Sequence, residues 1–401
     1  MNVIAGAPVE PSPQLFFTPS DPASRITRFT ADTWNSLKTL IEPSTGLIRD
    51  RIVVTDDGSY EFNHRTSPTN IGLFLAAVKA ARDLGLVTET EADGYIKQVL
   101  STLTKLKRYR GLYYNWYQTA DGLLESRQPF ISTVDNAWLL AGLITLKNAF
   151  PVYAKNVDRI INKVDFTLLY DFSDNLFYGG CDPKDGSLTP WHYGLLNSEA
   201  RIASYVGINY FNVPSQHLRQ LSYYSSLKGE PPYPSWGGSM FETFMPVLFV
   251  PENRDDGWQQ IHRYHIKKQI EAGSVNKGFW GYSPCDDTDG IYKEFGVKSL
   301  ALKPEGYNFS STVTPHAIFL ALPYEPQAAL DTLFRIQDYY PQSYLPGLGF
   351  ADSVNVLTGR VSKSRLALDK SMIFLSLYNH QTDNRLHSFF GSKLLTSIIP
   401  S

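Results

Sequence analysis

Three carboxylates lie where apolar helices are predicted to begin. Glu242 stands in "PSWGGSMFETFMP" (234–246), among Met and Phe side chains and just after Trp-Gly-Gly. Asp135 lies in "ISTVDNAW" and Glu199 in "GLLNSEARI". A carboxylate in apolar surroundings must find partners or shift its pKa, because burial disfavours its charged form. These three residues are therefore the first candidates for acid–base chemistry.

Three further residues could contribute to the same site. Asp369 lies in "RLALDKSM", His316 in "TVTPHAIF" and Asp287 in the acidic loop "SPCDDTDG". Each also has a simple structural interpretation. The helix dipole favours acidic residues in a first turn, a histidine on an apolar helix is often a hydrogen-bonded core residue, and the acidic loop could be a solvated turn. That loop lacks the spacing of a complete calcium motif, so we expect no metal and no cofactor.

Carboxylates combined with aromatic rings suit the hydrolysis of glycosidic bonds. One carboxylic acid must protonate the glycosidic oxygen while a second carboxylate activates water or attacks carbon. The chain is 13% aromatic, and many rings stand in glycine-rich loops, where they could stack on sugar faces or simply pack the loops. A helix N-terminus lowers the pKa of a carboxyl group, so burial and neighbouring carboxylates must raise it for the acid role.

Helical periodicity predicts two alternating kinds of helix. One kind is apolar all round and should be buried, whereas the other is amphipathic and should lie at the surface. The apolar segments are 68–84, 131–149, 195–208, 238–250, 312–322 and 365–380. The amphipathic segments are 89–107, 153–169, 215–227, 257–272, 327–339 and 385–399. Six inner and six outer helices predict an all-α (α/α)6 barrel, a six-hairpin toroid, with an extra helix near 31–42 outside it.

The connections between these segments are of two lengths. Links from inner to outer helices are short, whereas those leading back are long and rich in Gly and aromatic residues. Long loops in a compact domain are usually functional, and in such a barrel they all emerge on one face. We therefore expect the site at that face, with minor β segments in the loops near 175–180 and 347–361. One domain is predicted over 26–401, after an N-terminal extension over 1–25.

Composition and motifs exclude several classes of function. A formal net charge of −2 and the absence of a basic footprint argue against nucleic acid as a partner. We predict no membrane span and see no signal-peptide pattern, which leaves the compartment open. The two cysteines, Cys181 and Cys285, are expected to be free thiols. The metalloprotease, nucleophile-elbow and phosphate-loop motifs are missing, and we expect a monomer.

Six segments in order resemble one known family. They are "STVDNAWLLAGL", "YGLLNSEARIASYVGI", "SWGGSMFETFMP", "GYSP…YKEFGVKSLAL", "TVTPHAIFLAL" and "GFADSVN…DKSMIFLSL". Together they resemble the glycoamylase-like domain of bacterial endo-β-1,2-glucanases and of the cyclising domain of cyclic β-1,2-glucan synthases. The resemblance covers residues from about 60 to 385. It implies an (α/α)6 barrel and an inverting, metal-independent hydrolase acting on β-1,2-glucan, an oligo- or polysaccharide.

The resemblance also implies roles for individual residues. Glu199 is the expected general acid and Asp135 the general base, acting on water directly or through a substrate hydroxyl. Glu242 is expected to bind sugar or support the site, and it could instead be the acid. The expected substrate-binding residues are Trp236, Trp138, Trp280, Tyr282, Tyr114, Arg201, Asp287, His316 and Asp369. Two alternatives stay open, namely a polysaccharide lyase on the same barrel and a non-catalytic carbohydrate-binding protein.

Overall fold

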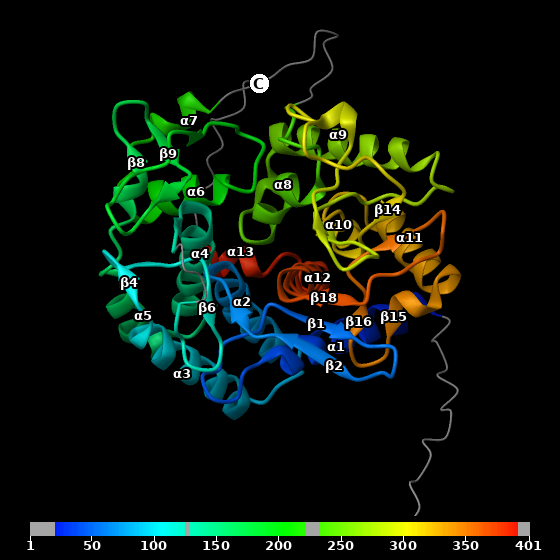
Figure 1. Ribbon diagram of the computed structural model, residues 1–401, viewed down its shortest axis with the longest axis horizontal. Coiled ribbons are helices and arrows are strands. Elements are labelled where there is room, and N and C mark those ends of the chain that lie inside the picture. The colour runs from blue at the N-terminus through cyan, green and yellow to red at the C-terminus, as the bar shows by residue number, and fades with distance from the viewer. Residues whose placement is uncertain (1–20, 125–128, 222–232, 392–401) are drawn as a thin grey trace, which may run out of the picture.

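The computed structural model describes residues 21–124, 129–221 and 233–391 (Figure 1). These residues are mainly helical, with many short strands. The α-helices within them are α1 (Pro22–Leu40), α2 (Pro68–Asp83), α3 (Glu89–Lys105), α4 (Thr133–Ala149), α5 (Ala154–Ile161), α6 (Arg201–Tyr210), α7 (His217–Gln220), α8 (Met240–Phe244), α9 (Asp256–Gly273), α10 (Pro315–Phe319), α11 (Pro326–Tyr339), α12 (Ala367–Gln381) and α13 (Leu386–Phe390).

Helices α2, α4 and α12 confirm that the most apolar segments are buried. Most of their residues are buried. The backbones of α2 and α4 touch, because a Cβ added to Gly72 would lie 2.3 Å from the carbonyl oxygen of Trp138. A Cβ added to Gly142 would lie 2.1 Å from the carbonyl oxygen of Gly72. Glycine at these two positions therefore permits the close packing of α2 on α4.

The helices are arranged around the centre of the molecule (Figure 1). Two sets of helices can be told apart in this view. Nearer the centre lie α2, α4, α6, α8, α10 and α12, and further out lie α3, α5, α7, α9 and α11. Helix α12 packs against α1, α2 and α10, and α4 packs against α2, α6 and α13. Helix α1 thus contacts an inner helix directly. The beginnings of α2, α4 and α12 are brought to one side, where the long loops gather.

Short strands occupy the long loops, as the sequence predicted. They are β1 (Arg51–Val54), β2 (Tyr60–Asn63), β3 (Arg65–Thr66), β4 (Arg108–Tyr109), β5 (Leu112–Tyr113), β6 (Tyr117–Gln118), β7 (Ile131–Ser132), β8 (Tyr170–Asp171), β9 (Leu176–Tyr178), β10 (Gly180–Cys181), β11 (His192–Tyr193), β12 (Cys285–Asp286), β13 (Tyr292–Lys293), β14 (Thr312–Val313), β15 (Tyr344–Leu345), β16 (Gly349–Phe350), β17 (Val354–Asn355) and β18 (Ser364–Leu366).

Antiparallel pairing joins loops that are far apart in the sequence. In the three-stranded sheet β18-β1-β2, Arg51 is paired with Leu366, and Ile52 is paired with both Arg365 and Phe62. The pair β3-β6 and the pair β12-β13 lie in other long loops. These pairings fix the loops relative to the helix N-termini, and so they help to position the site.

Several predicted helices are shorter or begin elsewhere. Helix α6 begins at Arg201, not 195, because the Ser198 hydroxyl accepts a hydrogen bond from the Ala200 amide and holds a turn there. Helix α8 ends at Phe244 and continues as the 3-10 helix η3 (Met245–Leu248), since Pro246 lacks an amide hydrogen. Glu199 therefore precedes its helix instead of opening it.

The ends of the described chain also differ from the prediction. Helix α1 begins at Pro22, capped by Asp21, so regular structure starts inside the predicted extension 1–25. Parts of the predicted helices 215–227 and 385–399 fall on residues 222–232 and 392–401, outside the described residues. Within the described part, these helices are represented by α7 and α13.

Two further sequence predictions concern cysteines and membrane spans. Cys181 and Cys285 are both free and buried. Across 21–124, 129–221 and 233–391, no single helix has the length and hydropathy of a membrane span. Helix α4 and the segment Pro151–Ile161 reach that length and hydropathy only together, and the chain bends by 117° between them. Helix α4 is itself packed against α2 and α6 in the core.

Candidate active site

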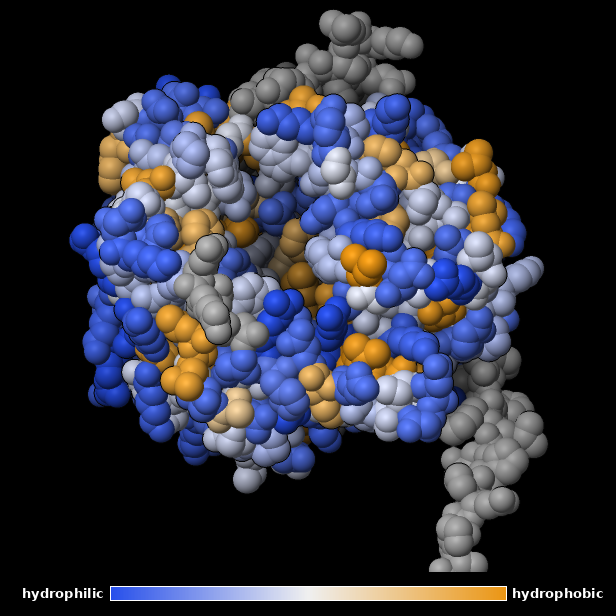
Figure 2. Space-filling model, viewed as in Figure 1, coloured by the Kyte–Doolittle hydropathy of each residue, from blue (hydrophilic) through white to orange (hydrophobic). Residues whose placement is uncertain are grey.

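A cavity of about 530 Å³ opens where the N-terminal ends of the apolar helices meet the long loops. Figure 2 shows that this face of the molecule is hollowed near its centre, with hydrophobic side chains in its depth. The size and the mixed lining are those of a small-molecule or oligosaccharide site. The cavity is lined by Asp50, Arg51, Arg65, Ser67, Thr69, Asn70, Trp116, Val134, Asp135, Trp138, Glu199, Phe241, Asp286, Tyr292, Glu294, Leu366 and Leu368.

Asp135 enters the cavity from the first turn of α4. The Ser132 hydroxyl caps this helix by accepting a hydrogen bond from the Asp135 amide. The Thr69 hydroxyl, from the first turn of α2, donates a hydrogen bond of 2.6 Å to Oδ1 of Asp135. Burial raises the pKa of Asp135, and the two hydroxyl contacts partly offset that rise.

Glu199 enters from the turn that precedes α6. Burial, together with the charge of Glu242, raises the pKa of Glu199 to about 7. The carboxyl group therefore holds its proton up to neutral pH. That is the protonation state a general acid requires, and burial overcomes the lowering influence of the nearby helix N-terminus.

Glu294 is a cavity carboxylate that sequence reasoning missed. It follows β13, and burial together with the charge of Glu242 raises its pKa to about 7. The segment "YKEFGVKSLAL" contains it. It lies in a loop, where no helical capping pattern marks a residue as part of the site. A cavity carboxylate so close in pKa to Glu199 is a second group able to hold a proton at neutral pH.

Glu242 lies beside the cavity and is not among its lining residues. It forms a capping box with Ser239, and its carboxylate accepts hydrogen bonds from the Ser235 hydroxyl (2.7 Å), the Gly237 amide (3.1 Å) and the Tyr307 hydroxyl (2.6 Å). The carboxyl group of Glu242 is held by hydroxyl and amide donors, and none of these donors is an arginine side chain. The structure thus places Glu242 as a buried, hydrogen-bonded carboxyl group near enough to Glu199 and Glu294 to act on both electrostatically.

Arginines neutralise the other acidic residues of the cavity wall. Arg51 forms an ion pair with Asp286, and Arg65 forms one of 3.3 Å with Asp50. None of the ion pairs found in the described part of the chain involves Asp135, Glu199 or Glu294. These three carboxylates are therefore the ones free of a cationic partner and suited to proton transfer.

Of the predicted aromatic platforms, Trp138 lines the cavity and packs against Phe249. Trp236, Trp280, Tyr282 and Tyr114 are not among the lining residues. Trp280 and Tyr282 are only 2% exposed, and the Tyr282 hydroxyl contacts Asn276, which indicates core packing.

Other rings line the cavity instead. Trp116 lies under the guanidinium of Arg65 at 4.0 Å, and Phe241 and Tyr292 also contribute to the wall. Trp116 and Tyr292 come from long loops, and Phe241 lies beside Glu242 on α8.

The remaining predicted binding residues lie outside the cavity lining. Asp287 pairs with Lys293, and its neighbour Asp286 lines the cavity in its place. His316 approaches Asp369 at 3.0 Å in a buried cluster. Asp369 also shares a hydrogen bond with Asp352.

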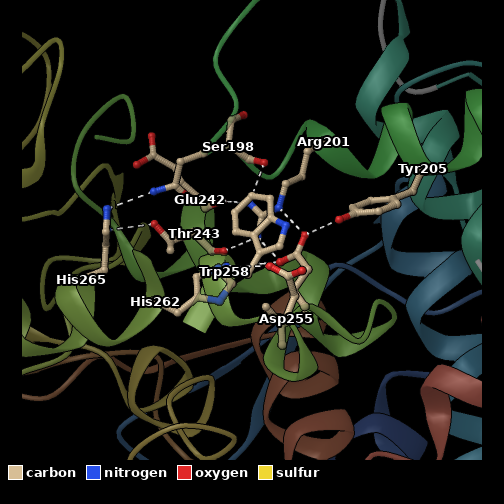
Figure 3. Close-up of polar contacts among 12 residues, drawn as sticks. Ser198, Arg201, Tyr205, Glu242, Thr243, Asp255, Trp258, His262 and His265 are labelled. Carbon is tan, nitrogen blue, oxygen red and sulfur yellow. Dashed lines mark hydrogen bonds and ion pairs between the residues drawn. The ribbon is translucent and has the colours of Figure 1, made fainter. Parts of the chain in front are cut away.

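Arg201 (Figure 3) is buried and forms an ion pair with Glu252. Glu252 lies 51 positions further along the chain and is not one of the candidate catalytic groups. The structure brings none of four predicted binding residues to the cavity wall, namely Asp287, His316, Asp369 and Arg201. Their contacts with substrate therefore stay predictions.

Two groups of acidic side chains in the described residues bear on metal binding. Asp287 and Asp289 of the acidic loop are engaged by Lys293 and Arg360, which leaves their carboxylates paired. Within the described ranges, three side chains with metal-ligand geometry, Asp171, Asp174 and His192, gather outside the cavity.

Comparison with known proteins divides the chain into two matched segments. Residues 28–219 match the family model described as "Protein of unknown function (DUF3131)". Residues 224–391 match the Glycoamylase family model, described as "Putative glucoamylase". The cyclic β-(1,2)-glucan synthase NdvB of Rhizobium meliloti is 22% identical over 79% of this chain. The chain spans only 16% of that synthase's length.

Solved structures show the same fold. The endo-β-1,2-glucanase of Chitinophaga pinensis, in complex with sophorotriose and glucose, matches with a TM-score of 0.78 and 16% identity over 92% of this chain and 95% of that one. The β-1,2-glucanase of Parabacteroides distasonis matches with a TM-score of 0.75 and 16% identity, over 94% of this chain and 59% of that one. The endo-β-1,2-glucanase of Talaromyces funiculosus, in complex with sophorose, matches with a TM-score of 0.69 and 13% identity, over 92% of this chain and 86% of that one.

The fold is thus one found in helical glycoside hydrolases. The resemblance noted in the sequence is confirmed, because the chain carries a glycoamylase-like segment and is homologous to a cyclic β-1,2-glucan synthase. It also shares its fold with endo-β-1,2-glucanases.

Proposed function

We propose that this chain is a glycoside hydrolase that cleaves β-1,2-glucan with inversion, inside an (α/α)6 barrel. The observation that carries the proposal is one cavity in which Asp135, Glu199 and Glu294 stand without cationic partners. The fold shared with endo-β-1,2-glucanases supports the choice of substrate. The alternation of central and peripheral helices supports the barrel.

Glu199 is the proposed general acid. Its carboxyl group is protonated at neutral pH and gives its proton to the glycosidic oxygen as the bond from that oxygen to C1 breaks. Asp135 is the proposed general base. It accepts a proton from water, directly or through a sugar hydroxyl, as the water oxygen bonds to C1. The Thr69 hydroxyl holds Asp135 in place for this step.

The geometry argues against Glu242 as the acid. Its oxygens accept hydrogen bonds from Ser235, Gly237, Ser239 and Tyr307, and the residue does not line the cavity. Glu294 is the alternative acid, since it lines the cavity and has the same raised pKa as Glu199. The two glutamates are distinguished by replacing each of them.

The test is incubation with β-1,2-, β-1,3-, β-1,4- and α-glucans, followed by measurement of reducing ends and by anomeric NMR of the products. We expect hydrolysis of β-1,2-glucan, and the Glu199→Gln variant should lose about 10²- to 10⁴-fold in kcat. Glu271→Gln, a change of a surface carboxylate on α9, is the matched control and should keep full activity. Unsaturated products would indicate a lyase. Binding of glucan without cleavage would indicate a carbohydrate-binding protein.

A further inference from the structure

Arg201, the first residue of α6, is a buried arginine that contacts two of the segments around the site. It is 3% exposed, and its partner Glu252 is 0% exposed. The pairing is bidentate, because Nε donates to Oε1 of Glu252 at 2.8 Å and Nη2 to Oε2 at 2.7 Å. This parallel geometry fixes the plane of the guanidinium group as well as its position.

The same guanidinium also binds three backbone carbonyl groups. Nη1 donates to the carbonyl oxygens of Ser198 at 3.0 Å and Glu242 at 3.3 Å, and Nη2 donates to that of Thr243 at 2.5 Å. Ser198 immediately precedes Glu199, whereas Glu242 and Thr243 belong to α8. Figure 3 shows Ser198, Glu242 and Thr243 gathered around the guanidinium of Arg201. One side chain therefore joins the turn that carries Glu199 to the helix that carries Glu242.

The turn that carries Glu199 is bound by the Arg201 guanidinium in addition to its own short-range hydrogen bonds. It precedes α6 and is held locally by short bonds, from the Arg201 amide to the Ser198 carbonyl at 3.1 Å and from the Ala200 amide to the Ser198 hydroxyl at 3.1 Å. The Ile202 amide also donates to the Glu199 carbonyl at 3.2 Å, so these short-range bonds hold the turn onto α6, whereas the Arg201 guanidinium ties it to α8. A small rotation of the turn would move the Glu199 carboxyl group within the cavity.

Three further side chains contact the pair. The Tyr205 hydroxyl donates to Oε1 of Glu252 at 2.8 Å, and the Trp258 ring lies 4.7 Å from the guanidinium carbon. His262 approaches Glu252 at 3.7 Å, but burial holds the pKa of His262 well below its usual value, so it is neutral. Buried ion pairs add little stability, since the cost of desolvation offsets their attraction. Stability alone therefore does not account for this pair.

We propose that Arg201 is a positioning residue that sets the place of Glu199 relative to Glu242 by binding the backbone of both segments. The inference rests on the proposed function, in which Glu199 is the general acid. The groups that act electrostatically on Glu199 include Glu242 and Glu294, and Tyr193 and Tyr307 face it as well. Arg201 acts on Glu199 through the protein backbone.

The experiment separates positioning from stability. In Arg201→Met/Glu252→Met, both charges are replaced by apolar side chains of similar length, a change that often preserves stability. In Tyr205→Phe, the control, one hydrogen bond to the same Glu252 is lost, but all contacts from the guanidinium to the carbonyls remain. We expect the double variant to melt at a lower temperature, because three backbone carbonyls lose their donor, but to stay folded at the assay temperature and to lose about 10- to 100-fold in kcat, with KM little changed. Tyr205→Phe should keep the wild-type kcat.

Two further measurements keep the inference testable. In Arg201→Lys, the charge is kept but a single ammonium group cannot bind the carboxylate and three carbonyls together, so kcat should also fall. The titration of the Glu199 carboxyl group is followed by carbon NMR, with Glu199→Gln for assignment. Its midpoint should move in both Arg201 variants and stay fixed in Tyr205→Phe.

The outcomes separate the inference from the proposed function. Wild-type kcat and an unchanged Glu199 titration in a folded double variant would overturn the positioning role. If the wild type cleaves no glucan, the proposed function fails, and the NMR titration alone then decides whether Arg201 places Glu199.

Discussion

The Thr69 hydroxyl donates a hydrogen bond of 2.6 Å to Oδ1 of Asp135, joining the first turns of α2 and α4. These two helices are also in backbone contact through Gly72 and Gly142. The proposed base is thus oriented by the neighbouring helix, and its orientation depends on how closely the two helices pack.

Thr69→Val removes this donor while keeping the shape of the side chain. The hydrogen bond favours the charged form of Asp135, so its loss should raise the pKa of Asp135 further. The acidic limb of the kcat profile should then move to higher pH. Thr69→Ser, which keeps the hydroxyl group, is the control and should show the wild-type limb. An unmoved limb in Thr69→Val would separate this contact from catalysis.

The alkaline limb of the same profile reports the proposed acid. Burial and Glu242 raise the pKa of Glu199 to about 7, so the active protonated form should disappear as pH rises through 7. Glu294→Gln removes the second group with a pKa of about 7 and one repulsive charge near Glu199. The limb should persist in this variant, shifted slightly to lower pH. Loss of the limb in Glu294→Gln would transfer the acid role to Glu294.

Trp116 is the cavity ring best placed to stack on a sugar, because Arg65 at 4.0 Å holds it from one side. Trp116→Ala should raise KM about tenfold, corresponding to ~1.4 kcal/mol of lost contact, with kcat less affected. Trp191→Ala removes an exposed ring that does not line the cavity and is the control. Steady-state kinetics on β-1,2-gluco-oligosaccharides measure both constants. Equal values of KM in the two variants would remove Trp116 from the binding surface.

Gly237 leaves room for the Tyr307 ring. A Cβ at this position would lie 1.7 Å from that ring, so Gly237→Ala should push Tyr307 away from Glu242. The loss of a donor to a buried carboxylate should cost about 1–3 kcal/mol in the free energy of unfolding. Gly94→Ala on α3, where nothing lies within 4 Å of the added Cβ, is the control and should be neutral or slightly stabilising. Denaturant unfolding compares the two, and equal stability would contradict the packing described.

Asp369 links stability to pH. Burial raises the pKa of Asp369 from 3.8 to about 7, so the folded state binds its proton more tightly than the unfolded state does. This contribution to stability is complete below pH 4 and is lost as pH rises to 7. Asp369→Asn should therefore flatten the fall in melting temperature between pH 4 and 7. Asp289→Asn, at an exposed ion pair with Arg360, should leave the slope unchanged.

Local sequence pattern was sufficient for the helices and for part of the site. The helices α2, α4 and α12 are apolar on every side, and that property alone predicts burial. Asp135 follows the capping residue Ser132, so its place at the start of α4 could be predicted from adjacent residues. Glu199 was found in the same way, although the Ser198 turn delays its helix by several residues.

Long-range contacts decided the rest. Trp116 reaches the cavity because β6 pairs with the distant strand β3, and Asp286 is held there by an ion pair with Arg51. Glu294 follows the local β12-β13 hairpin, whose place at the cavity depends on the whole fold. The partner of Arg201 was not predictable either, since Glu252 lies 51 positions away. The sequence by itself determined which helices are buried and which acids stand at their beginnings, because both follow from neighbouring residues. Only the tertiary structure decided which acid is exposed to the cavity and which is enclosed, because burial and charge depend on segments brought together by folding.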